Sequence, residues 1–452
     1  MQIDFLIFSI LKIVAIIAYL YGLLKFMGHP KLWVKIVGVL GAFAIIQLAL
    51  TPLFGMNPIL SSFDSGLLFQ SISMAMVALG LNLIYGFNGQ FSLGQFGFYG
   101  IGAYCSADIT YRWVNGDARG LLVVGIGTTL GALMIWLVGK WLGNYRRIPV
   151  LSSFAIYLVG SLVAGVIAVY LANLLNPIFT PFLGTTSAPG VLASGIPLQI
   201  VFFLAVVFAA IFAAEISFLF GLPVLSLGSD YFGIATLGFV IVVNTLMVNS
   251  DTILPFPEMK GGRGMLGIPQ LTTWFWAFLF LIVVIVIMRN VIHSSTGRAI
   301  LSVREDETAA KAMGIDIAGT KLLTFVIGSL FAGLAGGVYA HFIGFLSPGT
   351  FNFLVSFNPL IIVVFGGLGS MSGTLAASFG WIFFLEGLLR VILSQLGTDA
   401  PTWRYVLYPI TLLLLMLVRP QGLLGTIEWG FLKVKETVIH PKVETPTPTP
   451  VE

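Results

Sequence analysis

Charged residues are scarce in this chain, and their scarcity excludes an ordinary soluble domain. Only 9% of its 452 residues are charged, whereas 58% are hydrophobic and the mean hydropathy is +1.02. Soluble domains carry about 25% charged residues, so this sequence lacks the side chains needed to cover a water-exposed surface. The composition therefore predicts a polytopic protein embedded in a lipid bilayer.

The residue types of redox and metal sites are also scarce. Cys105 is the single cysteine, which excludes an intramolecular disulfide and any cysteine-rich metal site. The four histidines are widely scattered and show no ligand spacing. We expect no metal and no cofactor. The net charge of +4 is small, and we expect no nucleic-acid partner.

Catalytic motifs are missing as well. No G-x-x-x-x-G-K-[S/T] sequence occurs, and the nearest match, SSTGRAI at 294–300, has no lysine. The chain therefore lacks the phosphate-binding loop with which an ATPase holds its nucleotide. It also has no H-E-x-x-H sequence, nucleophile elbow or carboxylate pair, so we predict that it is not an enzyme.

What the chain has in abundance is apolar runs. A membrane helix needs about 20 largely apolar residues, and about thirteen candidates occur: 5–24, 34–53, 67–86, 91–110, 121–140, 150–175, 197–220, 231–249, 273–288, 322–345, 356–369, 373–395 and 404–418. The run 91–110 is glycine-rich and 356–369 is short, so either can be broken or re-entrant. The predicted fold is all-α and polytopic, with about 10–13 transmembrane helices. The first run lacks a basic region and a clear cleavage site, which favours a retained span over a signal peptide.

Basic residues orient these spans, because Lys and Arg collect in cytoplasmic loops. With the N-terminus outside, the basic clusters all fall on the cytoplasmic side: 25–35, 140–147, 289–321 and 419–435. Asp64 and Asp251 then lie outside. The exceptions are Arg112, Arg119, Lys260 and Arg263, partly balanced by Asp108, Asp117 and Glu258. We predict a multi-pass protein of the cell membrane with its C-terminus in the cytoplasm.

The longest charged segment, 297–321, contains a short helix with signals at both ends. Ser302 and Glu305 have the spacing of a capping box, and Gly314 suits a left-handed C-terminal cap. These signals predict a helix over Val303–Met313, too short to be stable alone in water. Either it docks on a partner, or it is an ordinary loop helix with a solvated face.

A second notable stretch, Leu79–Tyr104, combines glycines with polar side chains. Its glycines allow close helix approach. Its polar members are candidates for a translocation pathway: Asn82, Asn88, Gln90, Ser92 and Gln95. The alternative is that they are hydrogen-bond partners between helices. The same choice holds for Thr236 and Asn244, which lie eight residues apart and therefore near one face of a helix.

The second half repeats some of these features. Gly366, Gly367, Gly369 and Gly373 mark a helix break much like that in the first half, which indicates a weak two-fold internal repeat. Glu215 and Glu386 are the two carboxylates inside spans, and Arg390 is placed to pair with Glu386. We divide the chain into a two-span extension (1–66), a main transmembrane domain (67–425) and a low-complexity cytoplasmic tail (426–452).

Several of these stretches resemble the branched-chain amino-acid (LivM-type) permeases of ABC importers. The similar segments are GRAILSVREDETAAKAMGID, with its E-x-A-A…G pattern, NGQFSLGQFGFYGIGAY, and RPQGLLG at 419–425. The loop MKGGRGMLGIP departs from the family pattern at Lys260 and Arg263. The resemblance implies that 289–321 is a cytoplasmic coupling loop. The coupling residues it implies are Arg304, Glu305, Glu307, Ala309, Ala310 and Gly314.

The resemblance also implies partners: separate ATPase subunits, a second LivH-like permease and an extracytoplasmic solute-binding protein. The expected solute is a branched-chain or other hydrophobic amino acid, although urea and short amides use closely similar permeases. The rival hypothesis is a self-sufficient ion-coupled transporter or channel, with Glu215 or Glu386 binding the ion. A purely structural membrane scaffold is the third alternative.

Overall fold

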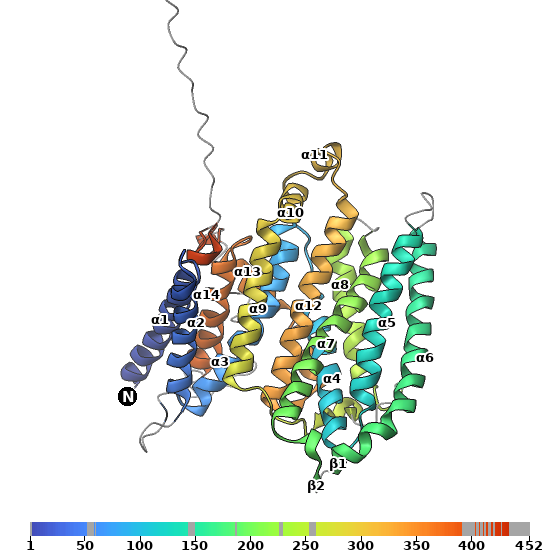
Figure 1. Ribbon diagram of the computed structural model, residues 1–452. Coiled ribbons are helices and arrows are strands. Elements are labelled where there is room, and N and C mark those ends of the chain that lie inside the picture. Colours follow the sequence, from blue (N-terminus) through green and yellow to red (C-terminus); the bar gives the residue numbers. More distant parts are fainter. Residues whose placement is uncertain are drawn as a thin grey trace, which may run out of the picture.

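The computed structural model describes most of the chain, and Figure 1 shows it as a bundle of upright helices. The described residues are 2–51, 58, 60–142, 150–185, 188–225, 229–252, 259–390, 421–425 and 427–433, with single positions between 403 and 418. Ten helices in this part of the chain are long and apolar enough to cross a membrane. The predicted all-α polytopic class is confirmed.

The first half supplies α1 (Gln2–Met27), α2 (Leu32–Leu50), α3 (Ser62–Leu81), the π-helical turn η1 (Asn82–Phe87), α4 (Gln95–Val114), α5 (Arg119–Leu142), α6 (Val150–Leu183) and α7 (Gly195–Val224). The second half supplies α8 (Ser229–Val248), α9 (Trp274–His293), α10 (Ser295–Glu305), α11 (Glu307–Ala312), α12 (Ile317–Ile343), α13 (Phe357–Gly366), α14 (Met371–Ile382) and the π-helical turn η7 (Phe383–Leu389). Short 3-10 turns are η2 (Val191–Ala193), η5 (Gly261–Arg263), η6 (Pro348–Phe351) and η8 (Gly430–Leu432).

The two doubtful runs are both helical, but neither is an ordinary span. The run 91–110 corresponds to α4, which has 20 residues and falls outside the ten apolar helices. The run 356–369 contains α13, which has only 10 residues. The last predicted span, 404–418, lies mostly outside the described residues.

The helices fall into a buried core and an exposed outer shell. In α3, 94% of the most apolar window is buried, compared with 22%, 11%, 17% and 22% in α1, α2, α5 and α6. Helix α4 is also buried along most of its length. Because protein rather than lipid surrounds α4, its glycines and polar side chains do not need to meet the hydropathy of a lipid-exposed span.

Glycines let α4 and α12 cross at close range in this core. A Cβ on Gly102 would overlap the carbonyl oxygen of Gly333, and one on Gly336 would overlap that of Tyr99. Backbone therefore rests on backbone at the crossing, as in other small-residue helix contacts within membranes. The same kind of contact joins Gly80 of α3 to Gly328 of α12.

The N-terminal helices are attached to the core at both ends. Lys12 of α1 lies 2.7 Å from a carboxylate oxygen of Asp64, which also forms a capping box with Ser61 at the start of α3. At the other end Gly28 touches the backbone of Gly430, and the rings of Tyr21 and Trp429 meet edge to face. Residues 427–433, assigned from the sequence to the tail, are thus packed against α1.

The end of the molecule opposite α11 carries the two antiparallel strand pairs. In β1 (Gly184–Thr185) and β2 (Ala188–Pro189), Gly184 pairs with Pro189. In β3 (Met265–Leu266) and β4 (Phe345–Leu346), Met265 pairs with Leu346. Figure 1 places β1, β2 and the N-terminus at this end, away from α10 and α11.

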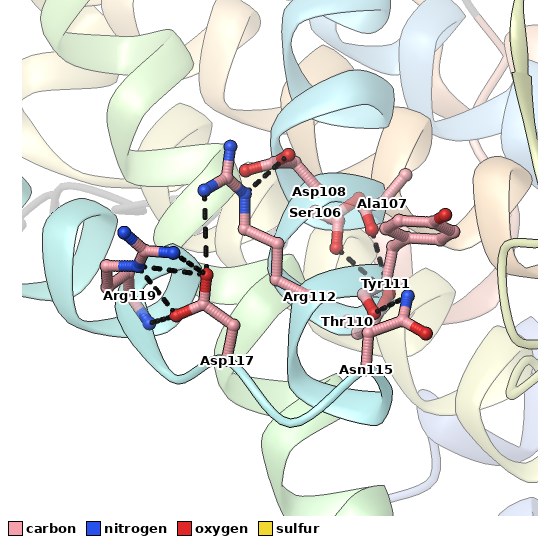
Figure 2. A network of polar contacts seen from close by, with 9 residues as sticks. All are labelled: Ser106, Ala107, Asp108, Thr110, Tyr111, Arg112, Asn115, Asp117 and Arg119. Atoms are coloured by element: carbon pink, nitrogen blue, oxygen red, sulfur yellow. Dashed lines mark hydrogen bonds and ion pairs between the residues drawn. The ribbon is translucent and has the colours of Figure 1, made fainter. Parts of the chain in front are cut away.

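The charges at this end neutralise one another at the α4–α5 corner, as Figure 2 shows. Arg112 Nε lies 3.0 Å from Asp108, and an Arg119 guanidinium nitrogen lies 2.8 Å from Asp117. Burial raises the pKa of Asp117, but hydrogen bonds from Arg119 and the charges of Arg119 and Arg112 outweigh it and hold that pKa below its usual value. These two arginines are therefore paired, as expected for exceptions to the basic-loop pattern.

The glycine crossing yields a stability prediction. Gly102→Ala and Gly336→Ala should each destabilise the protein by about 1–3 kcal/mol, because the added methyl group has to displace backbone. Thermal unfolding in detergent measures the loss. Gly165→Ala on α6 is the control, since no atom lies within 4 Å of its added Cβ. Equal melting temperatures for Gly336→Ala and Gly165→Ala would contradict this account of the crossing.

Candidate functional site

The charged segment 297–321 forms two helices that project beyond the ends of the membrane helices (Figure 1). The prediction of one helix over Val303–Met313 is wrong, because α10 ends at Glu305 and α11 begins at Glu307. Asp306 between them is extended and accepts hydrogen bonds from the N–H groups of Thr308 and Ala309. Aspartate competes for these donors outside a helix and so favours a new N-terminus.

The predicted capping box is wrong for the same reason. Ser302 lies within α10, and its hydroxyl donates to the carbonyl of Ala299 at 2.8 Å. The N-cap of α10 is Ser294, eight residues earlier, which accepts from the N–H of Gly297. A capping-box spacing is found wherever Ser precedes Glu by three residues, and here a better N-cap residue follows at Asp306.

The predicted C-terminal cap at Gly314 is confirmed. Its φ is +85°, its N–H donates to Lys311, and the N–H of Ile315 donates to Ala310. This pair of bonds is a Schellman motif, which needs a residue with positive φ and hence favours glycine. The chain then turns into α12, where Lys321 Nζ lies 2.6 Å from Glu307.

Most of the six candidate coupling residues face outward. Arg304, Glu305, Glu307, Ala309 and Gly314 are exposed, whereas Ala310 is 97% buried against the chain. Met313 is 83% exposed, which leaves a large apolar side chain at the tip of the projection. The segment thus offers a mixed apolar and charged surface on a rigid, capped helix.

Arg304 connects this projection to the membrane domain. Its Nη1 donates to the carbonyl oxygen of Gly86 at 2.7 Å. Gly369 lies beside the same nitrogen, since a Cβ added there would be 2.9 Å from it. Gly86 is in the π-helical turn that ends the first broken helix, and Gly369 follows α13 in the second. One guanidinium therefore touches both breaks.

Asn82 joins the two breaks from inside. It is fully buried, and its Nδ2 donates to the Ser370 carbonyl and the Thr374 hydroxyl, both at 2.9 Å. Its Oδ1 accepts from the N–H of Gly369 at 2.9 Å. Asn82 was a candidate pathway residue, but its hydrogen bonds are those of the alternative, a partner between helices.

The segment after α14 closes this junction. The N–H groups of Leu423 and Leu424 donate to the carbonyls of Phe365 and Gly366, which end α13. Glu428 accepts from the N–H groups of Met371 and Ser372 at 2.6 and 3.0 Å, and so caps α14. The local sequence around Glu428 gives no signal of this role. Burial raises its pKa, and the hydrogen bonds from Ser372 and Met371 offset part of that rise.

The stretch from Asn88 to Gln95, which connects η1 to the start of α4, has buried amide side chains that, unlike Asn82, include unpaired polar atoms. Asn88 Nδ2 donates to Thr324 at 2.9 Å, but its Oδ1 has no hydrogen-bond partner in the described part of the chain. The same holds for Gln90 Oε1 and for both polar atoms of Gln95. Such groups cost free energy unless water or a ligand pairs with them. Ser92, in contrast, accepts from the N–H of Gly94.

The two candidates on α8 are both held by the protein itself. Thr236 accepts from the N–H of Leu93 at 3.0 Å and donates to Gly233 at 2.9 Å. Asn244 donates to the carbonyl of Pro348 at 2.6 Å, toward the other end of the bundle. They lie along one helix but bond to separate segments.

The acids within the spans differ from each other. Glu386 lies 3.7 Å from Arg390, which confirms the predicted pair. Glu215 of α7 faces Gly131 of α5, and its Oε1 has no hydrogen-bond partner among the described residues. No three His, Cys, Asp or Glu side chains come together as a metal site in the described ranges.

The hydrogen bonds predict opposite responses at two buried amides. Asn82→Leu should destabilise the protein by about 3 kcal/mol, because it leaves the N–H of Gly369 without an acceptor and removes two further hydrogen bonds. Gln95→Met should leave the stability unchanged or raise it, since no protein partner is lost. Thermal unfolding of both variants in detergent measures the difference. A larger loss for Gln95→Met than for Asn82→Leu would show that the two roles are reversed.

Known proteins to which this chain is similar are transport permeases. The family model described as "Branched-chain amino acid transport system / permease component" matches residues 65–175 and 144–416. The permease protein LivM of Escherichia coli K12 is 31% identical over 245 residues, 48% of this chain and 56% of that protein. The chain thus spans about half the length of that relative. No solved structure matches the chain.

Two further relatives widen the comparison. A probable branched-chain amino acid transport permease protein LivM of Methanocaldococcus jannaschii is 26% identical over 305 residues, 62% of this chain and 86% of that protein. The permease protein LivH of Escherichia coli K12 is 30% identical over 161 residues, 35% of this chain and 48% of that protein. Helices α1 and α2 lie outside the residues that the family model matches.

Proposed function

The chain belongs to the family of branched-chain amino acid transport system permease components, and from this premise we propose that it is the membrane subunit of an ATP-driven importer. The observation that carries the proposal is the capped α10–α11 projection, which Arg304 links to both helix breaks. A projection that donates a hydrogen bond to one break and lies against the other is suited to transmit a movement from outside the membrane into the bundle.

The proposed solute is a branched-chain or other hydrophobic amino acid. The support is the description of the matching family and the printed names of the relatives, which are branched-chain amino acid permeases. Urea or a short amide is the alternative solute within the same class of importer. The solute-binding protein, rather than this chain, would make most of that choice.

The proposed partners follow from what the chain lacks and what it exposes. It has no phosphate-binding loop, so ATP would be hydrolysed by separate subunits docked on α11 and Met313. A second, LivH-like permease would complete the pore, and an extracytoplasmic solute-binding protein would deliver the amino acid. This arrangement places α10 and α11 in the cytoplasm and the N-terminus outside.

The hydrogen bonds narrow the proposed translocation pathway. Asn88, Gln90 and Gln95 present buried polar atoms that no described protein group pairs, so a passing polar solute or water can use them. Asn82, Ser92, Thr236 and Asn244 make bonds within the protein. We therefore propose Asn88, Gln90 and Gln95 as the residues of the pathway that meet the solute, with Thr236 holding Leu93 of the same segment in place.

Coupling is tested at the tip of the projection. Glu307→Lys and Gly314→Pro should leave the protein in the membrane but abolish ATPase co-purification and ATP-driven uptake. The first reverses a surface charge beside Lys321, and the second cannot adopt the positive φ of the cap. Either variant retaining normal uptake and ATPase binding would refute docking at α11.

A charge swap and an ion gradient provide the controls. Glu307→Lys combined with Lys321→Glu restores the internal pair but keeps the altered surface, so uptake should remain lost if Glu307 contacts the ATPase. Recovery by the swap would assign Glu307 a purely internal role.

The purified chain alone, in vesicles with a proton or sodium gradient, should move no amino acid. Gradient-driven uptake lost on Glu386→Gln would establish the ion-coupled rival.

Orientation is tested with single cysteines in a Cys105→Ser background. Met313→Cys should react with an impermeant thiol reagent only when the cytoplasmic side is accessible, because Met313 is exposed at the tip of the projection. Thr252→Cys, at the end of α8, should react from outside intact cells. The opposite labelling pattern would place the projection outside and exclude ATPase docking there.

A further inference from the structure

A narrow apolar groove runs between α1 and α2, and we propose that it binds one acyl chain of an anionic phospholipid whose headgroup lies on the lysines of residues 25–35. The groove has a volume of about 450 Å³. Its lining is almost wholly apolar and includes Gly22, Leu23 and Phe26 of α1 and Val37, Gly41 and Ile45 of α2. Nothing in the transport proposal uses this groove, and the inference does not depend on which solute is carried.

Glycines provide open space in the groove, and the one hydroxyl in its lining is already hydrogen-bonded. A Cβ added at Gly22 or Gly41 would meet no atom within 4 Å, so these glycines leave open space between the helices. Tyr19, the one residue with a hydroxyl in the lining, donates it to the carbonyl of Ala42 at 3.0 Å. The remaining surface therefore offers contact to hydrocarbon, and its one further donor is the indole N–H of Trp33.

The groove lies between two helices whose surfaces are mostly exposed, so that lipid can reach it. Only 22% of the apolar window of α1 and 11% of that of α2 is buried within the protein. The lining comes from the later part of α1 and the first part of α2, the halves nearest the end of the bundle that carries α10 and α11 (Figure 1). At its mouth Trp33 is 78% exposed, as tryptophans are at the headgroup level of a bilayer.

The charge at this mouth is positive and is not neutralised within the described protein. Lys25 lies in the last turn of α1, and Lys31 and Lys35 flank Trp33 at the start of α2. None of the three forms an ion pair with a described carboxylate; Lys25 Nζ lies 5.9 Å above the ring of Tyr21. Basic residues beside a membrane attract anionic lipid by about 1 kcal/mol each, which is about five-fold in affinity.

The chemistry of the groove favours a lipid as its occupant. The groove extends from Tyr19 to Phe26, about 10 Å along α1, and its lining is almost wholly apolar over that length. An acyl chain matches this lining, and a negatively charged headgroup matches the lysines at the mouth.

The test is lipid retention by the purified full-length protein, measured by native mass spectrometry with phosphatidylglycerol and phosphatidylcholine. The wild type should retain phosphatidylglycerol in preference to phosphatidylcholine. Gly41→Phe, which fills the groove, should lower that retention to the level of nonspecific lipid. Replacing Lys25, Lys31 and Lys35 by Gln should weaken it about five-fold for each lysine removed.

Matched controls separate this site from general surface effects. Gly165→Phe on α6 adds the same side chain at another open glycine, and Lys140→Gln removes a lysine at the end of α5; neither should change retention. Unchanged retention in Gly41→Phe, or equal retention of the two lipids by the wild type, would overturn the proposal. A shift from dimer to monomer in Gly41→Phe without lipid loss would assign the groove to a second copy of the chain and equally exclude the lipid.

Discussion

The hydrogen bonds of Asn82 are the constraint on which the membrane domain depends. Two helices are interrupted near the same end of the bundle, one after Phe87 and one after Gly366, and each interruption frees backbone donors and acceptors. Such groups cannot remain unpaired in an apolar interior. Asn82 pairs with the second interruption through the N–H of Gly369 and the carbonyl of Ser370. Asn82, at the start of the first interruption, thus pairs with backbone groups that the second interruption frees.

Two peripheral segments converge on this junction from opposite directions. Arg304 reaches it from α10, donating to Gly86, and Glu428 reaches it from the C-terminal side, capping α14. Charged groups suit these positions because a helix N-terminus attracts a carboxylate and a freed carbonyl attracts a guanidinium. Under the proposed function, a movement of α10 would therefore displace both breaks before it displaced the regular parts of the helices.

The sequence predicted the fold better than the junction. Apolar runs and glycine clusters identified the spans, the doubtful helices α4 and α13, and the cap at Gly314, because each depends on local composition. The capping box at Ser302 failed because α10 already begins after Ser294 and runs through Ser302, and a Ser-x-x-Glu spacing does not show where a helix begins. Asn82 and Gln95 looked alike in the sequence, because they differ only in their spatial neighbours. Asn82 accepts a hydrogen bond from the N–H of Gly369, whereas the polar atoms of Gln95 have no partner among the described residues. Glu428 acquires its role only through contacts with residues 56 and 57 positions away.

The division between core and shell explains how one chain can be both very apolar and rich in glycine and amides. Helices α5 and α6 are largely exposed on the outside of the bundle and carry apolar surface, while α3, α4 and α12 face one another and can replace side chains by backbone contact. Close backbone contact leaves little room for adjustment within each crossing, so the regular helices would move as units. Conformational adjustment is then confined to the interrupted segments, where polar groups can exchange hydrogen-bond partners. The buried amides of 88–95 lie in one of these segments, between the rigid crossing of α4 with α12 and the anchor of Arg304. That placement is what would allow a displacement of α10 to change the surroundings of a polar solute without unfolding any helix.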